Sequence, residues 1–337
     1  MEMSNSLSFW KRQIKICMML AVAFGMVGCQ TFDDIGLKTR EQVEKEKRVT
    51  QPEEGESKPS EVVGEVSQDV DKKLFNIQDE NVRPKLGLIL GPGMALSLGH
   101  LGVLKALNDQ KLPIEVIAGV EWSSLIAANY ALNGAANDMA WKASQGQLNV
   151  GVEKGFLRGE IKETSEDEVA KLIQTYTRGR AISNGKIKFI CPALDVSNAK
   201  ALYFKSGSYG RALQSCMKAP PLTQSEPRVW ANLTDIESLA KEMRRMGAEK
   251  VILVNALPLG GGLNWGERSS AVSPRDKYFW AQVQRSMVQK PNSVDHILTL
   301  NTGGQSVLDF KEKRNLIQQS STRADQFFRD LARKYSF

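Results

Sequence analysis

The chain reads KLGLILGPGMALSLGHLGVLKAL from residue 85 to residue 107. The apolar run Lys85 to Leu90 is short and rich in Leu and Ile, which predicts a buried parallel strand. Gly91-Pro92-Gly93 then predicts a turn, and the residues from Ala95 to Leu107 have the apolar period of a helix. A glycine turn between a strand and a helix can direct backbone N–H groups at an oxyanion or phosphate, although such a turn alone is more often plain turn geometry.

A second unit of the same kind follows closely in the sequence. Ile114 to Ala118 predicts another short strand, and Ser124 to Asn133 predicts another helix. The residues between them are Gly119-Val120-Glu121-Trp122-Ser123. Strands that alternate with helices indicate an α/β fold with a parallel sheet.

Together these units resemble the patatin-like phospholipases. The matching segments are residues 88–93, 100–107 and 116–119, followed by Ala193-Leu194-Asp195, Ala212 to Leu222, Gly247-Ala248 and Val251 to Asn255. The resemblance runs in order from Lys85 to about Leu257 and implies a three-layer α/β/α fold with a mainly parallel central sheet. It also implies a glycine-rich oxyanion hole in the first loop and, in the second, a G-x-S-x-G elbow that carries a nucleophilic serine.

The elbow departs from the family pattern at two positions. It reads G-x-E-x-S, so that Glu121 stands at the serine position and Ser123 at the second glycine. The neighbouring Ser124 does not restore the pattern, because Trp122 and Ile126 flank it instead of glycines. Since larger side chains at the glycine positions collide with the strand and helix, we expect a degenerate elbow without a nucleophile.

The oxyanion loop and the catalytic base also differ from the family. Pro92 has no N–H to donate, and Leu96 stands where the family has an arginine. Counted back from Gly247, the Asp-Gly element that supplies the family's base is replaced by Ala231 and Asn232. The residues expected to form the altered oxyanion loop are Gly91, Pro92, Gly93 and Met94.

These departures favour a non-catalytic protein. Nucleophile, base and oxyanion hole act as a unit, so losing the first two and part of the third removes the selected reaction. The ligand that the fold suggests is a lipid, through its acyl chain or an anionic head group, and a periplasmic protein is the other candidate partner. Met94, Leu96 and Trp122 would make the mouth of the site apolar, or they pack in the core.

An enzyme with an altered mechanism is the alternative, for instance a lipid acyl hydrolase or another hydrolase. Glu121 would act as general base or nucleophile, with Asp235, Asp195 or Glu153 as a second acid. A raised pKa of Glu121 beside a deep pocket would favour this hypothesis, whereas a filled elbow would favour binding without catalysis.

The first 82 residues have the pattern of a targeting segment and a tether rather than of a folded domain. Residues 1–28 combine Lys11, Arg12 and Lys15 with a short apolar run, which predicts a signal peptide. The run ends in Met26-Val27-Gly28-Cys29, which resembles a bacterial lipobox and implies lipidation of Cys29. Because Gln30 and not Asp follows the cysteine, we expect sorting to the periplasmic face of the outer membrane of a Gram-negative bacterium.

The rest of the chain divides into two parts. Residues 29–82 read as a disordered acidic tether, and residues 83–337 as one α/β domain.

The net charge and the remaining reactive side chains limit which partners and cofactors we expect. The whole chain carries a formal charge of +7 although the tether is acidic, so the domain is strongly basic and suits anionic partners, while nucleic acid is not expected outside the cytoplasm. No metal-ligand spacing and no nucleotide-binding motif occurs, so we expect neither metal nor cofactor. Cys191 and Cys216 can form a disulfide or remain buried thiols. His100 is expected to pack or cap, and His296 to lie on a late strand.

Overall fold

The computed structural model of the chain describes residues 83–145, 148, 166–223, 228–311 and 313–337. All of them belong to one compact unit, Lys73–Phe337. The expected signal peptide, Cys29 and the acidic tether lie outside the described residues, as does Glu153. Among the helices that the structure describes, none has both the length and the hydropathy needed to cross a bilayer.

A single, mainly parallel sheet forms the centre of this unit. Its order is β4-β3-β2-β1-β6-β7, and β5 pairs with β3. Strands β1, β2, β3, β6 and β7 pair in parallel, whereas β4 and β5 run antiparallel to β3. The bounds are β1 Leu86–Leu90, β2 Ile114–Gly119, β3 Lys188–Asp195, β4 Lys200–Phe204, β5 Val229–Ala231, β6 Lys250–Asn255 and β7 His296–Thr299. β1 is buried along its whole length, as its unbroken apolar run predicts.

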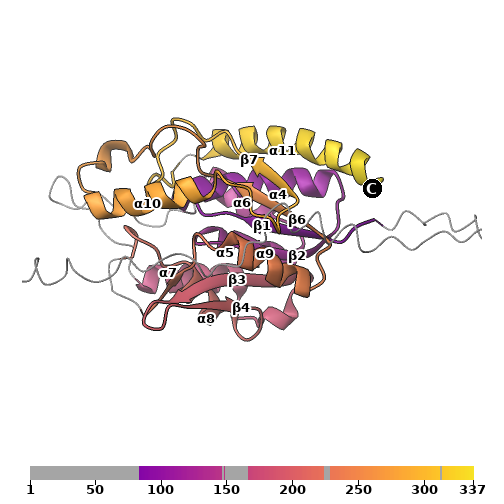
Figure 1. The fold of residues 1–337 in the computed structure, drawn as a ribbon, viewed down its shortest axis with the longest axis horizontal. Coiled ribbons are helices and arrows are strands. Elements are labelled where there is room, and N and C mark those ends of the chain that lie inside the picture. The colour runs from indigo at the N-terminus through magenta and orange to yellow at the C-terminus, as the bar shows by residue number, and fades with distance from the viewer. Residues whose placement is uncertain (1–82, 146–147, 149–165, 224–227, 312) are drawn as a thin grey trace, which may run out of the picture. The chain divides into compact units, whose positions relative to one another are not determined.

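Helices cover both faces of the sheet, which confirms the expected three-layer α/β/α class. Helices α4 and α5 contact each other, α11 packs along α4, and α9 contacts β1, β2 and β6 (Figure 1). Right-handed crossovers place α9 on the face opposite to α4 and α5. The described helices are η1 Met94–Leu98, α4 Gly99–Asp109, α5 Ser123–Asn133, α6 Asn137–Ser144, α7 Glu166–Thr177, η2 Ile182–Asn184, α8 Tyr209–Cys216, α9 Ile236–Arg245, η3 Gly266–Arg268, α10 Pro274–Ser286 and α11 Arg314–Tyr335.

One predicted helix is divided in the structure. The segment from Ala95 to Leu107 forms the 3-10 turn η1 and then α4. The N–H of Ala95, in the first turn and without an acceptor inside it, donates to the carbonyl of Val307, 3.0 Å away in the C-terminal part of the chain. The glycine-rich loop is thereby attached to a segment that lies more than two hundred residues further along.

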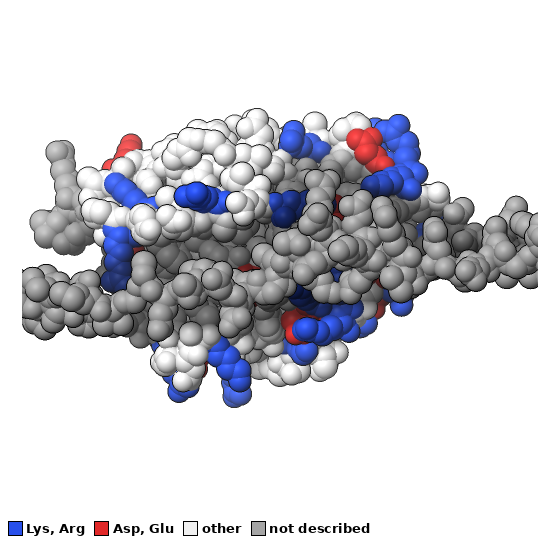
Figure 2. Space-filling view, viewed as in Figure 1, with Lys and Arg blue, Asp and Glu red and all other residues white. Residues whose placement is uncertain are grey.

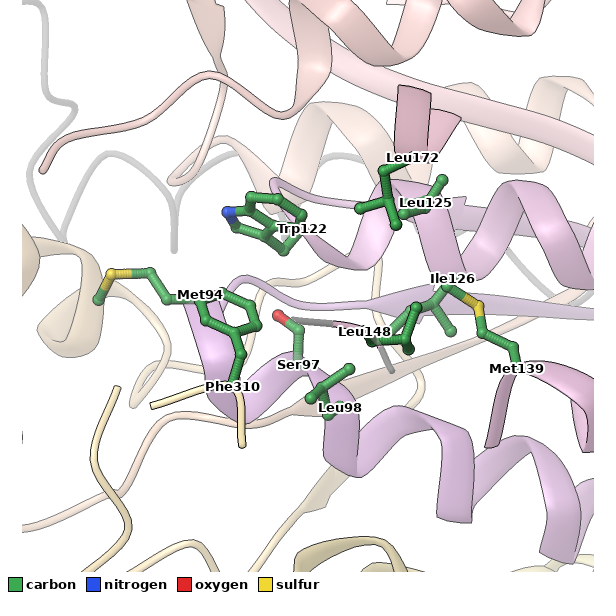
Figure 3. Close-up of a pocket in the computed structure, with 10 residues that line it drawn as sticks. All are labelled: Met94, Ser97, Leu98, Trp122, Leu125, Ile126, Met139, Leu148, Leu172 and Phe310. Atoms are coloured by element: carbon green, nitrogen blue, oxygen red, sulfur yellow. The ribbon is translucent and has the colours of Figure 1, made fainter. Parts of the chain in front are cut away.

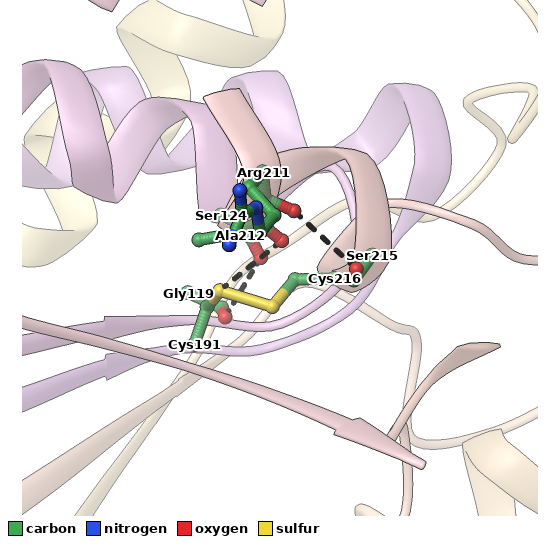
Figure 4. Close-up of a disulfide and its surroundings, with 7 residues drawn as sticks. All are labelled: Gly119, Ser124, Cys191, Arg211, Ala212, Ser215 and Cys216. Atoms are coloured by element: carbon green, nitrogen blue, oxygen red, sulfur yellow. Dashed lines mark hydrogen bonds between the residues drawn. A yellow bond between two sulfur atoms is a disulfide. The ribbon is translucent and has the colours of Figure 1, made fainter. Parts of the chain in front are cut away.

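A disulfide joins strand β3 of the sheet to helix α8. Cys191 on β3 and Cys216 at the end of α8 are bonded, with their Cα atoms 6.1 Å apart (Figure 4). Both residues are fully buried. The bond decides between the two alternatives that the sequence left open, and Figure 4 shows it close to Gly119 and Ser124, where β2 passes into α5.

Candidate active site of a degenerate elbow

The turn between β2 and α5 keeps the backbone geometry of a nucleophile elbow. Glu121 lies at its apex with φ +59°, a left-handed conformation that costs a non-glycine residue about 1–2 kcal/mol. A Cβ on Gly119 would lie 2.4 Å from both the carbonyl oxygen of Ser123 and the Cα of Ser124. Strand and helix therefore approach so closely that the first glycine is required, although no nucleophile stands at the apex.

A serine is tolerated at the second glycine position of the elbow because its hydroxyl has a buried hydrogen-bond acceptor. Ser123 is fully buried, and its Oγ donates a 2.6 Å hydrogen bond to the carbonyl of Gly91. Ser124 donates in the same manner to the carbonyl of Gly119, at 2.8 Å. Both hydroxyls are engaged inside the turn, so neither replaces the missing nucleophile.

The carboxylate of Glu121 occupies the loop that follows β1. Its Oε2 accepts hydrogen bonds from the N–H groups of Met94, at 2.9 Å, and of Gly93, at 3.3 Å. Pro92 comes immediately before these two donors, so its missing N–H leaves both of them in place. Backbone donors that could stabilise an oxyanion thus bind a side chain of the protein itself.

Burial dominates the electrostatics of Glu121. The residue has no exposed surface, and its Oε1 has no hydrogen-bond partner among the described residues. Burial raises the pKa of Glu121 to about 7, against the opposing effect of the N–H groups of Trp122, Met94 and Gly93. The raised pKa is the feature expected of a general base, but the carboxylate is enclosed and faces donors rather than a space for substrate.

His100 supports the same loop from α4. Its Nε2 lies 3.0 Å from the carbonyl of Gly91, which also accepts the hydroxyl of Ser123. Burial lowers the pKa of His100 to about 4, so the imidazole is neutral at physiological pH. A neutral ring that donates to a backbone carbonyl holds the loop in place, and none of the described carboxylates is bonded to it to form a triad.

Ala231 and Asn232 lie on and just after β5. Ala231 pairs with Ala193 of β3, and the N–H of Asn232 donates to the carbonyl of Pro192 at 3.4 Å. Within the described residues no hydrogen bond joins either of them to Glu121. The structure therefore brings the loop and Glu121 together but provides no base at the family's position.

The other acids proposed from the sequence have structural partners. Asp195 accepts hydrogen bonds from Arg228, Ser197 and Asn198 at the end of β3, and these interactions hold the pKa of its carboxyl below the usual value. The side chain of Asp235 caps α9 by accepting the N–H of Ser238 at 3.1 Å. Neither arrangement leaves a carboxylate available as a second acid.

The capping role of Asp235 leads to a prediction that distinguishes a structural carboxylate from a catalytic base. Asp235→Ala is expected to reduce the free energy of unfolding by about 1 kcal/mol, as loss of an N-cap usually does. Asp235→Asn keeps the accepting oxygen and is expected to stay close to wild type in urea denaturation. Equal destabilisation by the alanine and asparagine variants would contradict the capping role.

An apolar pocket opens beside the elbow and the loop. It has about 290 Å³ of empty space, a figure that includes open solvent, so the part enclosed by protein is much smaller. Figure 3 shows Ser97 among apolar side chains, and neither its hydroxyl nor the indole N–H of Trp122 has a partner among the described residues. The lining residues are Met94, Ser97, Leu98, Trp122, Leu125, Ile126, Met139, Leu148, Leu172 and Phe310.

One wall of the pocket comes from a part of the chain that the sequence did not indicate. The ring of Phe310 meets Trp122 edge to face, with centroids 5.2 Å apart. Met94 and Trp122 line the mouth, as their apolar character suggested, whereas Leu96 is buried and does not line the pocket. In the part of the chain that the structure describes, no cluster of His, Cys, Asp or Glu could hold a metal ion.

The fold and the site define a class of protein. It is an α/β protein in which a glycine loop after β1 and an elbow after β2 meet at the carboxyl edge of a parallel sheet, with Glu121 at the apex of the elbow.

Known proteins share parts of this sequence, although no family model matches the chain. The chain is 25% identical over 178 residues to lysophospholipase nte1 of Aspergillus fumigatus, a match that covers 50% of this chain and 12% of that protein. The corresponding lysophospholipase of Kluyveromyces lactis is 44% identical over 48 residues, which are 14% of this chain and 3% of that one. The chain thus spans only a small part of the length of the curated relatives that it matches. These matches support distant homology to part of these lysophospholipases.

Among solved structures, the chain is similar to full-length ExoU in its complex with SpcU from the type III secretion system of Pseudomonas aeruginosa. That comparison has a TM-score of 0.41 and 10% identity, and covers 74% of this chain and 53% of the other.

Proposed function

We propose that this protein is a non-catalytic relative of the patatin-like phospholipases that binds the apolar part of a lipid. One observation carries the proposal: the carboxylate of Glu121 takes the two backbone donors of Gly93 and Met94. A substrate carbonyl would need these same donors for its oxyanion. Because the carboxylate is fully buried, substrate cannot reach it without displacing it from the loop.

The lining of the pocket supports a lipid chain as the ligand. Among the described residues its walls consist of Leu, Ile, Met, Phe and Trp side chains with Ser97, and none of them is charged. The hydroxyl of Ser97 and the indole N–H of Trp122 have no partner in the described part of the chain, and as donors they can bind an oxygen of an ester or alcohol. An anionic head group is less suited to this place, because the loop donors are already bound by a carboxylate of the protein.

We further propose that the protein acts at the periplasmic face of the outer membrane, anchored by a lipid on Cys29. The basic n-region, the apolar run and the lipobox-like end of residues 1–28 support this location. The disulfide between Cys191 and Cys216 suits an oxidising compartment such as the periplasm. Labelling of the expressed protein with radioactive palmitate, lost in a Cys29→Ser variant, is the direct test of the anchor.

The absence of catalysis is tested with the chain from residue 29 onward carrying Cys29→Ser, beside the same chain with Glu121→Ala. We expect neither protein to hydrolyse short p-nitrophenyl esters or phospholipid vesicles above the rate of a heat-denatured sample. Turnover by the first protein that disappears in the Glu121→Ala variant would overturn the proposal and make Glu121 a catalytic residue.

Lipid binding is tested by displacement of a bound dye, N-phenyl-1-naphthylamine, with decanol and decanoate. Leu172→Trp on α7 fills the pocket and is expected to weaken binding of decanol about tenfold or more, as loss of a preformed apolar site should. Val169→Trp, one turn away on α7 but not in the pocket lining, is the matched control. If decanol binds both variants as it binds the wild type, the pocket is not the site and a protein partner becomes the better candidate.

A further inference from the structure

The pocket lies beside the carboxyl ends of the parallel strands, and a second feature lies at their amino ends, near Arg83, the first described residue. The ring of Tyr335, near the end of α11, has the Nζ of Lys334 at 5.5 Å and the Nζ of Lys250 at 5.9 Å from its centroid. Its hydroxyl lies 2.8 Å from Nε2 of His296 at the start of β7. Aromatic and cationic side chains therefore form one cluster at the amino ends of the strands.

Three further cations belong to this cluster. The Nε of Arg83 donates to the carbonyl of Ser336 at 3.2 Å, and the carbonyl of Lys85 accepts the N–H of Lys250 at 3.1 Å. The Nζ of Lys290 donates to the carbonyl of Asp295, beside His296. We name this surface the tether-side patch, made of Arg83, Lys85, Lys250, Lys290 and Lys334 around Tyr335. Figure 2 shows basic side chains gathered at the end of the molecule that α11 reaches, with acidic ones among them.

Most of the positive charge in the tether-side patch is not neutralised by described carboxylates. Of its five cations, only Lys250 forms an ion pair with a described acid, at 3.5 Å from Asp295. That carboxylate is already bound by Arg244 and by the N–H of Val251. The side chains of Arg83, Lys85, Lys290 and Lys334 are exposed, and of these four Lys85 also interacts with the charge of Glu115. The charges of Arg83, Lys290 and Lys334 are therefore the ones most available to an external anion.

We propose that the tether-side patch docks the domain onto an anionic lipid bilayer. Several lysines and arginines on one surface gain free energy together from anionic head groups, and aromatic rings such as Tyr335 and the half-buried Phe337 suit the head-group region. The patch also includes Arg83, the first described residue, through which residues 29–82 join the domain. A lipid on Cys29 would keep the patch close to a bilayer and raise its effective concentration there. The charge of the patch does not depend on that lipid.

The test uses the chain from residue 29 with Cys29→Ser, so that no lipid anchor contributes. Its co-sedimentation is measured with vesicles of phosphatidylcholine alone and with 30% phosphatidylglycerol, a composition of our choosing that gives a surface potential of a few tens of millivolts. The patch variant carries Lys85→Glu, Lys290→Glu and Lys334→Glu. The control variant carries Lys171→Glu, Lys200→Glu and Lys277→Glu, which makes the same change in net charge on α7, β4 and α10.

We expect binding to the anionic vesicles that weakens about tenfold or more in the patch variant, and weakens again as salt is raised. The control variant should remain within about threefold of wild type, since distant charges are screened. A glutamine version of the patch variant gives the same ranking with a milder change, in case the glutamate version fails to fold. Equal loss in patch and control variants, equal binding to neutral vesicles, or no binding by the wild type would each overturn the proposal.

Discussion

Glu121→Gln is expected to stabilise the protein by about 3 kcal/mol at pH 8 and to change its stability little at pH 4.5. The native pKa of Glu121 is about 7 because of burial, whereas the unfolded chain titrates near the ordinary value of 4.5. Between these two pH values the native state binds more protons than the unfolded state, so the stability of the wild type falls as pH rises. Glutamine keeps the accepting oxygen for Met94 and Gly93 without the charge, so this loss disappears.

The measurement is the difference in free energy of unfolding between the variant and the wild type, taken at several pH values from 4.5 to 8. Because the native pKa of His100 is about 4, the stability of the protein also falls as the pH drops below 6.5. This effect is the same in the variant and in the wild type. Glu115→Gln is a control of opposite sign: because Lys188 holds the pKa of Glu115 below its usual value, this variant should be less stable than the wild type over most of this pH range, and the difference should shrink only as pH falls below the usual value. A difference for Glu121→Gln that does not change with pH would show that this carboxylate is not buried in the loop.

Loss of the disulfide between Cys191 and Cys216 is expected to reduce the free energy of unfolding by about 3 kcal/mol. The two cysteines are 25 residues apart, and closing a loop of that length removes about this much conformational freedom from the unfolded chain. The bond joins β3 to α8 close to Gly119 and Ser124 (Figure 4), so we expect its loss to loosen the elbow as well.

Urea denaturation with and without dithiothreitol measures this effect. Wild type should become less stable in the reductant, whereas the Cys191→Ala/Cys216→Ala double variant should be weaker from the start and insensitive to it. The double variant also loses two buried sulfur atoms, so the wild type in reductant gives the cleaner value. Identical unfolding curves of the wild type with and without reductant would contradict a bond between these cysteines.

The sequence predicts the centre of the fold better than its edges. The apolar runs of β1 and β6 identify buried parallel strands, because both faces of such strands are covered, and β2 is apolar apart from Glu115. The short β5 and the division of η1 from α4 carry no comparable local signal. β5 depends on its pairing with β3, which local periodicity cannot reveal.

The candidate site shows the same limit. Glu121, Ser123, Ala231 and Asn232 can be read as departures from a family pattern, because the pattern fixes their positions along the chain. That the carboxylate of Glu121 turns into the glycine loop depends on donors 27 and 28 residues away. The wall that Phe310 adds to the pocket comes from still further along the chain, and no motif surrounds that residue.

The direction of the strands has a consequence for where a lipid would come from. Because β1, β2, β6 and β7 run in parallel, the pocket lies beside the ends of β1 and β2, and the tether-side patch surrounds the starts of β1, β6 and β7. The five residues of β1 alone separate these two edges by about 17 Å. A domain that rests on a bilayer through the patch therefore opens its pocket towards the water. Its ligand would have to cross the aqueous space, as a single molecule or on a carrier, and would not be drawn from the membrane beneath.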